Sequence, residues 1–197
     1  VEEGTAAVRR GAQAVVIAAP PPPEQTLSEL LSFSAWARSL GCEPSGRVIA
    51  LSRRTATPDD TAALALGADE PVWDLTRVRM LDGRAVMIER STYPHRIGQI
   101  VAALDLERVS ITSALLDHDI HLARARHTID ARPASADDAS LLGVDEGAPL
   151  LRVRRLATSP LGEPLERGED RYLGDAVAFS VDNVARQAST RRTADRS

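Results

Sequence analysis

Two spacings of hydrophobic and polar positions divide this chain into segments of helix and of strand. Apolar residues recur at helical spacing in residues 26–41, 57–67, 95–104, 110–120 and 135–143. Strand-like segments cover residues 46–54 and 121–133 and two hairpins, one after residue 71 and one after residue 148. Residues 1–19 read as a helix end followed by a short pair of strands. The pattern predicts an α+β protein with helices packed on an antiparallel sheet.

Polar residues that can cap a helix precede most of the helical segments. Thr26 with Glu29 three residues later has the form of a capping box, and that helix is expected to end at Gly41. Thr57, followed by Pro58, is expected to cap the helix at residues 57–67. Ser110 and Ser135 are the expected caps of residues 110–120 and 135–143, so each of these helices has a local start signal.

A helix followed by a hairpin occurs twice in the chain. "TPDDTAALALGADEPV" corresponds to "SADDASLLGVDEGAPL", and each is followed by an Arg-x-Arg strand and a returning strand that ends in Glu-Arg. On this alignment Arg152 and Arg154 repeat Arg77 and Arg79. Two copies are too few for a solenoid, so the sequence predicts a pseudo-symmetric domain built from a duplicated helix-hairpin unit.

The register of the first hairpin decides where its charged residues lie. Alternation along the strand places Trp73, Leu75, Arg77 and Arg79 on one side. A three-residue loop at 82–84 would pair Arg77 with Glu89 and give a half-buried face of Arg77, Arg79, Glu89 and Ser91, whereas a two-residue Asp-Gly loop would place Glu89 on the opposite side. Such a face could bind a phosphate or carboxylate, or it could be an Arg-Glu pair at the sheet surface.

Composition narrows the classes of function. The chain has 197 residues, 43% of them hydrophobic, with no apolar run long enough to span a membrane, so a soluble cytoplasmic protein is expected. The single Cys42 excludes an intrachain disulfide and a cysteine-based metal cluster. All 24 basic residues are arginine, yet the net charge is -4, which argues against nucleic-acid binding by the whole chain.

The series of motifs resembles a known family. Its order is a capped helix, Leu-Gly-x-Asp-Glu, Arg-x-Arg, Asp-Gly, Ile-Glu-x-Ser-x-x-Pro and, later, Glu-(x)5-Tyr-x-Gly-Asp. This order is similar to that of the UTRA domain, the effector-binding domain of the HutC subfamily of GntR transcription regulators. The resemblance runs from about Thr26 to Asp182 and implies a chorismate lyase-like fold. It also implies a homodimer whose pocket binds a small metabolite, often a phosphorylated sugar or another anion.

The resemblance also implies roles for individual residues. Arg77 and Arg79 would bind the anionic end of the ligand, and Ser110 and Thr112 would add hydroxyl groups at a helix start. The remaining expected ligand-binding residues either close over the pocket or orient the rest of the ligand; they are Ser32, Phe33, Ser34, Glu89, Glu166 and Tyr172. Leu173 and Ala176 stand where the family commonly has arginine, which indicates a change at that edge of the site.

The expected domain organisation follows from the same comparison. Residues 1–19 resemble the wing of a winged helix-turn-helix, residues 20–25 form a Pro-rich linker, residues 26–184 form the UTRA-like domain and residues 185–197 form a flexible tail. The chain begins at Val1, so the DNA-binding head was either lost in evolution or lies outside this sequence, and DNA binding is expected only where such a head is present.

Other chemistry is weakly indicated. His118, His121 and His127 cross a helix-strand boundary without a set of partner ligands, so they are interpreted as surface residues and no metal is expected. No cofactor motif or nucleophile with an evident base occurs, so no catalytic residue is assigned. An enzyme recruited on the same fold, with Glu89 or Glu166 as the acid or base, remains the alternative to a sensor domain.

Overall fold

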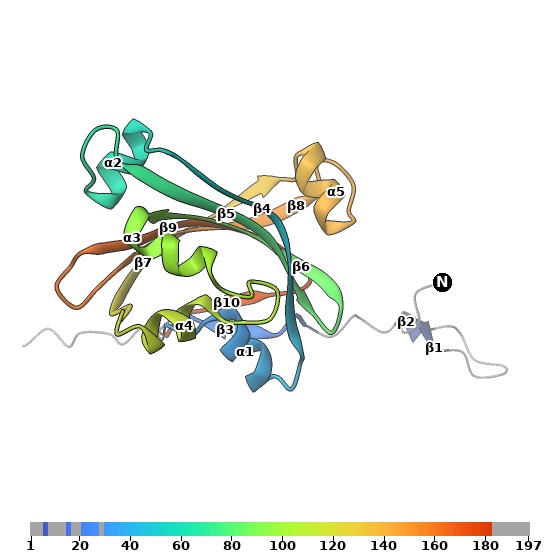
Figure 1. Ribbon diagram of the computed structural model, residues 1–197. Helices are drawn as coiled ribbons and strands as arrows, with labels where there is room; N and C mark the ends of the chain where they lie inside the picture. Colours follow the sequence, from blue (N-terminus) through green and yellow to red (C-terminus); the bar gives the residue numbers. More distant parts are fainter. Residues whose placement is uncertain (1–5, 8–14, 17–20, 28–29, 183–197) are drawn as a thin grey trace, which may run out of the picture.

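The computed structural model describes residues 6–7, 15–16, 21–27 and 30–182. Its centre is a six-stranded antiparallel sheet with the order β4-β5-β6-β9-β8-β7. Figure 1 shows α2 and α5 on one face of this sheet, here called the outer face, while α1, α3, α4, β3 and β10 lie below the opposite face, called the cavity face. The predicted α+β architecture, with helices on an antiparallel sheet, is therefore confirmed.

The elements follow the chain in an order that repeats a helix and a hairpin. They are β1 (Ala6–Ala7), β2 (Val15–Val16), β3 (Glu24–Thr26), α1 (Phe33–Ser39), β4 (Pro44–Thr55), α2 (Pro58–Leu64), β5 (Pro71–Leu81), β6 (Arg84–Pro94), α3 (His95–Ala102), α4 (Ile111–Asp117), β7 (Arg124–Pro133), α5 (Ala136–Leu142), β8 (Pro149–Thr158), β9 (Pro164–Leu173) and β10 (Ala178–Ser180). The short strands β1 and β2 pair antiparallel, as the sequence indicated for this region. The tail from residue 185, and the helix end expected before β1, lie outside the described residues. Within the described part of the chain, no helix combines the length and apolar character needed to cross a bilayer.

Local capping signals place three helices correctly. Thr57 and Ser135 cap α2 and α5, and each forms a complete capping box with the acid three residues later, Asp60 or Asp138. Ser110 caps α4 and accepts a hydrogen bond from the Ser113 amide. These starts are predictable because a capping box involves only residues within one turn of each other.

The predicted start of the first helix is wrong. Thr26 belongs to β3, which pairs in parallel with β10 and places Thr26 opposite Ser180. The helix instead begins at Phe33, where the Ser32 hydroxyl accepts from the Ala35 amide. The extended backbone required by the β3–β10 pairing is incompatible with a helix start at Thr26, so a contact across most of the chain overrides the local signal.

The turn of the first hairpin combines both registers that the sequence allowed. Asp82 and Gly83 form a two-residue turn, both with positive φ, and Leu81 pairs with Arg84. An irregularity then follows, because Met80 pairs with Ala85 but Arg79 pairs with Met87, which leaves Val86 as the extra residue of a bulge. The bulge restores the register of a three-residue loop, so Arg77 lies opposite Glu89, which is the first of the two alternatives that the sequence left open.

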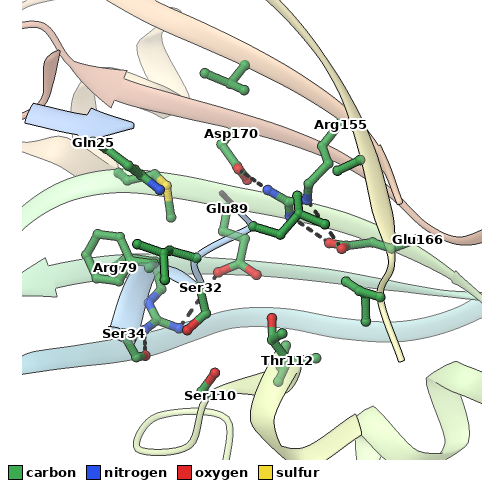
Figure 2. A pocket seen from close by; sticks show the side chains of 18 of the residues that line it. Gln25, Ser32, Ser34, Arg79, Glu89, Ser110, Thr112, Arg155, Glu166 and Asp170 are labelled. Carbon is green, nitrogen blue, oxygen red and sulfur yellow. Dashed lines mark hydrogen bonds and ion pairs between the residues drawn. The ribbon is translucent and has the colours of Figure 1, made fainter. Parts of the chain in front are cut away.

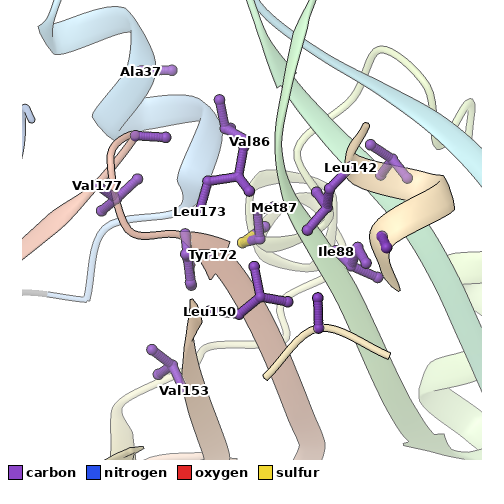
Figure 3. Packing of buried hydrophobic residues seen from close by; sticks show 14 of the residues in the cluster. Ala37, Val86, Met87, Ile88, Leu142, Leu150, Val153, Tyr172, Leu173 and Val177 are labelled. Atoms are coloured by element: carbon purple, nitrogen blue, oxygen red, sulfur yellow. The ribbon is translucent and has the colours of Figure 1, made fainter. Parts of the chain in front are cut away.

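Apolar packing fixes the sheet to its surrounding elements. Figure 3 shows Met87 and Tyr172, from the central strands β6 and β9, packed with Val177 below the helix that carries Ala37. Leu173 and Ala176, which replace arginines expected from the family, are 6% and 4% exposed and belong to this cluster. That edge is therefore part of the apolar core and does not line the cavity described below.

Candidate functional site

A cavity lies between the cavity face of the sheet and the elements below it. Its volume is about 130 Å³, room for roughly four water molecules at a share of about 30 Å³ each. All ten residues expected at the ligand site line it, namely Ser32, Phe33, Ser34, Arg77, Arg79, Glu89, Ser110, Thr112, Glu166 and Tyr172. Figure 2 shows side chains from α1, the start of α4 and the sheet converging on this space.

Arg77 is already satisfied by protein groups. Its Nε and Nη2 donate to the Glu89 carboxylate at 2.8 and 3.2 Å, and its Nη1 donates to the Leu106 carbonyl at 2.8 Å. Burial alone would raise the pKa of Glu89, but the positive charges of Arg77 and Arg79 outweigh it and leave that pKa lowered. The pair therefore forms a buried, charge-balanced wall of the cavity rather than an open cationic group.

Arg79 lies beside this pair, and its guanidinium group is only partly hydrogen-bonded. It is 3% exposed; its Nη2 donates to the Ser34 hydroxyl at 2.9 Å, its Nη1 is 3.8 Å from Glu89, and its Nε has no partner. The guanidinium carbon lies 4.7 Å from the centre of the Phe33 ring. Burial, together with the positive charge of Arg77, lowers the pKa of Arg79 to about 10. Of the two predicted anion-binding arginines, Arg79 is the one without a carboxylate of its own.

The second hairpin contributes a different arginine from the one that the sequence alignment indicated. Arg152 lies on the outer face, where it pairs with Asp130. Arg155 instead lies six residues after the first residue of its strand, as Arg77 does in β5, and donates through Nε and Nη2 to Glu166. The repeat alignment was therefore offset by three residues at this strand: each strand begins fourteen residues after the N-cap of its helix, at Pro71 and at Pro149, so Arg155 and not Arg152 corresponds to Arg77.

Asp170 is a buried carboxylate of the cavity that sequence reasoning missed. It is 1% exposed, its Oδ2 accepts from Arg155 Nη1 at 2.7 Å, and its Oδ1 has no partner. Burial raises the pKa of Asp170 to about 7; Arg155 opposes this rise, while Glu89 and Glu166 add to it. Its place four residues after Glu166, on the same strand face, was the available signal.

One oxygen of Glu166 accepts hydrogen bonds from two neighbouring strands, β6 and β8. Its Oε1 accepts from Ser91 at 2.6 Å, from Arg155 at 2.8 Å and from the Tyr93 hydroxyl at 3.4 Å. Each hairpin thus supplies an arginine-carboxylate pair, Arg77 with Glu89 and Arg155 with Glu166, on the same face of the sheet.

Two further cavity residues depart from the sequence interpretation. His127 was assigned to the surface with His118 and His121, which are exposed, but it is half-buried and lines the cavity. Burial and the charge of Arg155 lower its pKa. Gln25, which the sequence placed in the linker, lies on β3 and lines the cavity with 9% exposure.

The fold and the cavity define the class of this protein, and comparison with known families agrees. The UTRA domain model matches residues 39–178, so the chain belongs to the UTRA domain family. It carries the effector-binding domain of a GntR-family, HutC-type transcription regulator, and its sheet and helices have the chorismate lyase-like arrangement of such domains.

Individual relatives and structures fit the same family. The chain is 29% identical to the HTH-type transcriptional repressor NagR of Bacillus subtilis over 161 residues, which is 79% of this chain and 64% of NagR. It is 30% identical to the HTH-type transcriptional repressor PhnF of Mycolicibacterium smegmatis over 76% of this chain and 62% of PhnF. The chain thus spans less than two thirds of the length of either relative.

Solved structures resemble the chain over most of its length. The crystal structure of PhnF from Mycobacterium smegmatis has a TM-score of 0.79 and 27% identity, covering 93% of this chain and 80% of that one. The crystal structure of the separate effector domain of PhnF has a TM-score of 0.77 and 26% identity. The match covers 83% of this chain and all of that domain. The likeness therefore extends over the whole of that solved effector domain.

Proposed function

We propose that this domain senses a small anionic metabolite and that Arg79 binds its negative charge. The observation that carries the proposal is a buried guanidinium with an unpartnered Nε and only a 3.8 Å contact to a carboxylate that Arg77 already occupies. A buried cation without a counter-charge is unfavourable, and an anion in the cavity would remove that penalty. Guanidinium groups suit phosphate and carboxylate ligands because their donors form a planar fork.

The surroundings of Arg79 support an oxyanion as its partner. Ser34 already contacts it, and the hydroxyl groups of Ser32, Ser110 and Thr112 line the same cavity. Figure 2 shows these hydroxyl-bearing residues on the side of the cavity nearer Arg79, away from Arg155 and Asp170. Hydroxyl donors and a guanidinium group together suit the several acceptor oxygens of a phosphate, so the anionic end of the effector is assigned to this corner.

A thermal-shift experiment tests the assignment. Sulfate or inorganic phosphate, compared with chloride at matched ionic strength, should raise the melting temperature of the full chain by several degrees because it binds only the folded state. Arg79→Met should abolish the shift, while Arg152→Met, an arginine on the outer face paired with Asp130, should leave it intact. A shift that persists in Arg79→Met, or that is lost equally in Arg152→Met, would overturn the proposal.

The proposed regulator acts as a homodimer that transmits effector binding to DNA-binding heads. The sheet ends in β4 and β7, whose outer edges pair with no other strand of the described residues. Unpaired strand edges favour association with another chain or cover by another element. NagR and PhnF are named as HTH-type repressors, which supports an N-terminal winged-helix head as the part that would contact DNA.

An enzyme on the same fold is a second candidate, and Asp170 is the observation that favours it. Glu89 has a lowered pKa and is a weak base, whereas Asp170, with a pKa of about 7, could exchange a proton near neutral pH. The test is to recover the small molecule that copurifies with the protein and to incubate it with fresh protein. If NMR shows that the small molecule is unchanged after incubation, turnover is excluded. Conversion by the native protein that is lost in Asp170→Asn would support the enzyme.

A further inference from the structure

Three polar atoms that are buried and have no hydrogen-bond partner belong to residues that line the cavity. They are Gln25 Oε1, Arg79 Nε and Asp170 Oδ1, and all three residues line the same space. Buried polar atoms without a partner are rare because each one loses its hydration without compensation. The proposed anion accounts for Arg79, and it leaves the two oxygen atoms unexplained.

The two oxygens require a donor that the protein does not provide. Arg77 is fully engaged with Glu89 and the Leu106 carbonyl, and Arg155 donates to Glu166 and to the other oxygen of Asp170. Gln25 and Asp170 also come from different elements, β3 and β9, and Figure 2 shows both on the wall of the cavity away from Ser110 and Thr112. Any group bound between them must therefore donate hydrogen bonds while the anionic end lies at Arg79.

Apolar side chains near the unpartnered oxygens of Gln25 and Asp170 favour ligands that can donate hydrogen bonds to them. Gln25 pairs with Phe179 across β3 and β10, and the Phe179 ring packs edge-on against Tyr172 at 5.2 Å between ring centres. Met87 and Val153 line the same cavity. Apolar walls hold few water molecules, so a ligand without a donor would leave both acceptors unsatisfied, and such sites discriminate strongly between ligands.

We propose that Gln25 and Asp170 determine specificity, by accepting hydrogen bonds from an amino or hydroxyl group at the end of the effector opposite its anionic group. This inference rests on the proposed function and narrows its substrate class. The effector is a small anion, such as a phosphate monoester, that carries a hydrogen-bond donor a few atoms from its charge. A purely apolar tail does not fit this end of the cavity.

A matched series of simple probes tests the inference by isothermal titration of the full chain. The probes are inorganic phosphate, propyl phosphate, 3-hydroxypropyl phosphate and 3-aminopropyl phosphate, with homologues of two and four carbons to allow for the length of the cavity. The amino or hydroxyl probe of the best length should bind about tenfold more tightly than its alkyl analogue, the size expected for one or two buried hydrogen bonds. Equal affinities across every length would overturn the inference.

Variants then assign the preference to the two residues. Gln25→Leu, which removes the acceptor but keeps the volume, should reduce the preference to about twofold, and Gln25→Glu should retain it. Asp170→Asn should reduce the preference for the amino probe over the hydroxyl probe, because the carboxylate charge is lost. Gln99→Leu, at an exposed position on α3, is the matched control and should change nothing.

Inorganic phosphate separates this inference from the proposed function. It reaches only Arg79, so its affinity should be unchanged in Gln25→Leu, which also shows that the variant is folded. If phosphate binds but the longer probes all bind equally well, the role of Gln25 and Asp170 is overturned while the anion site stands. Failure of the unmodified protein to bind phosphate at all would overturn the anion site itself. A preference that survives in both Gln25→Leu and Asp170→Asn would also reject the assignment.

Discussion

Arg167 on β9 donates to the Asp60 carboxylate on α2 at 2.8 Å, although the two residues belong to different copies of the helix-hairpin unit. The opposite exchange also occurs, because Arg90 on β6 donates to Asp138 on α5 at 2.8 Å. The Glu-Arg pair of each returning strand, Glu89-Arg90 in β6 and Glu166-Arg167 in β9, therefore has two roles. The glutamate faces the cavity, and the arginine holds the capping acid of the other copy's helix on the outer face.

This reciprocal pairing predicts a stability effect that depends on pH. Burial would raise the pKa of Asp138, but hydrogen bonds from Arg90, Ser135 and Arg171 lower it to about 2. Because its folded-state pKa is depressed, Asp138 stabilises the fold above the ordinary value of 3.8, and this contribution is lost as the pH falls from there toward 2. Asp138→Asn should lower the free energy of unfolding by about 3 kcal/mol at pH 7, measured by urea titration.

The control for that substitution is its neighbour in the same helical turn. Asp137 is exposed, and Asp137→Asn should change the free energy of unfolding by less than about 0.5 kcal/mol. The difference between the two variants should shrink as the titrations are repeated toward pH 3. Equal effects of both substitutions at pH 7 would show that the pairing with Arg90 and Arg171 does not stabilise α5.

The contact of α3 with β5 predicts intolerance of any side chain at Gly98. A Cβ atom there would lie 2.3 Å from Trp73 Cδ1 and 2.4 Å from its Cβ, inside van der Waals contact. Gly98→Ala should therefore lower the free energy of unfolding by about 3 kcal/mol, because helix and strand must separate. Gly174→Ala is the matched control, since a Cβ atom at that position meets nothing within 4 Å. Loss of stability in both variants would contradict the prediction.

Asp170 predicts a second, opposite pH effect. Burial raises its pKa from the ordinary 3.8 to about 7, so the folded state binds a proton that the unfolded state has lost in this interval. Its contribution to the free energy of unfolding should therefore fall as the pH rises from about 4 to about 7. Thermal unfolding across this range should show the decline in the native protein and a flatter profile in Asp170→Asn. Parallel profiles would exclude a raised pKa at Asp170.

The proposed homodimer predicts a mass twice that of the 21.1 kDa chain. Light scattering at micromolar concentration should detect it, because edge strands such as β4 and β7 are expected to be covered in solution. A single monomeric species across the micromolar range would contradict the proposal.

The sequence determined those parts of this protein that depend on neighbouring residues. The capping boxes at Thr57 and Ser135, the helix start at Ser110 and the alternation that places Arg77 with Arg79 are set within one turn or one strand. The family resemblance then identified a set of residues that do gather around one cavity. A short-range pattern can be read from the chain because the partners are fixed by chain geometry.

Only the tertiary structure decided the pairings between distant segments. β10 draws Thr26 into a strand, a bulge at Val86 restores the hairpin register, and the offset of the second repeat exchanges Arg152 for Arg155. Likewise Gln25 enters the cavity only because β3 is held by a strand about 150 residues later. These outcomes depend on which elements pack together in the folded protein. The neighbours of a residue in the sequence therefore could not predict whether that residue would be buried.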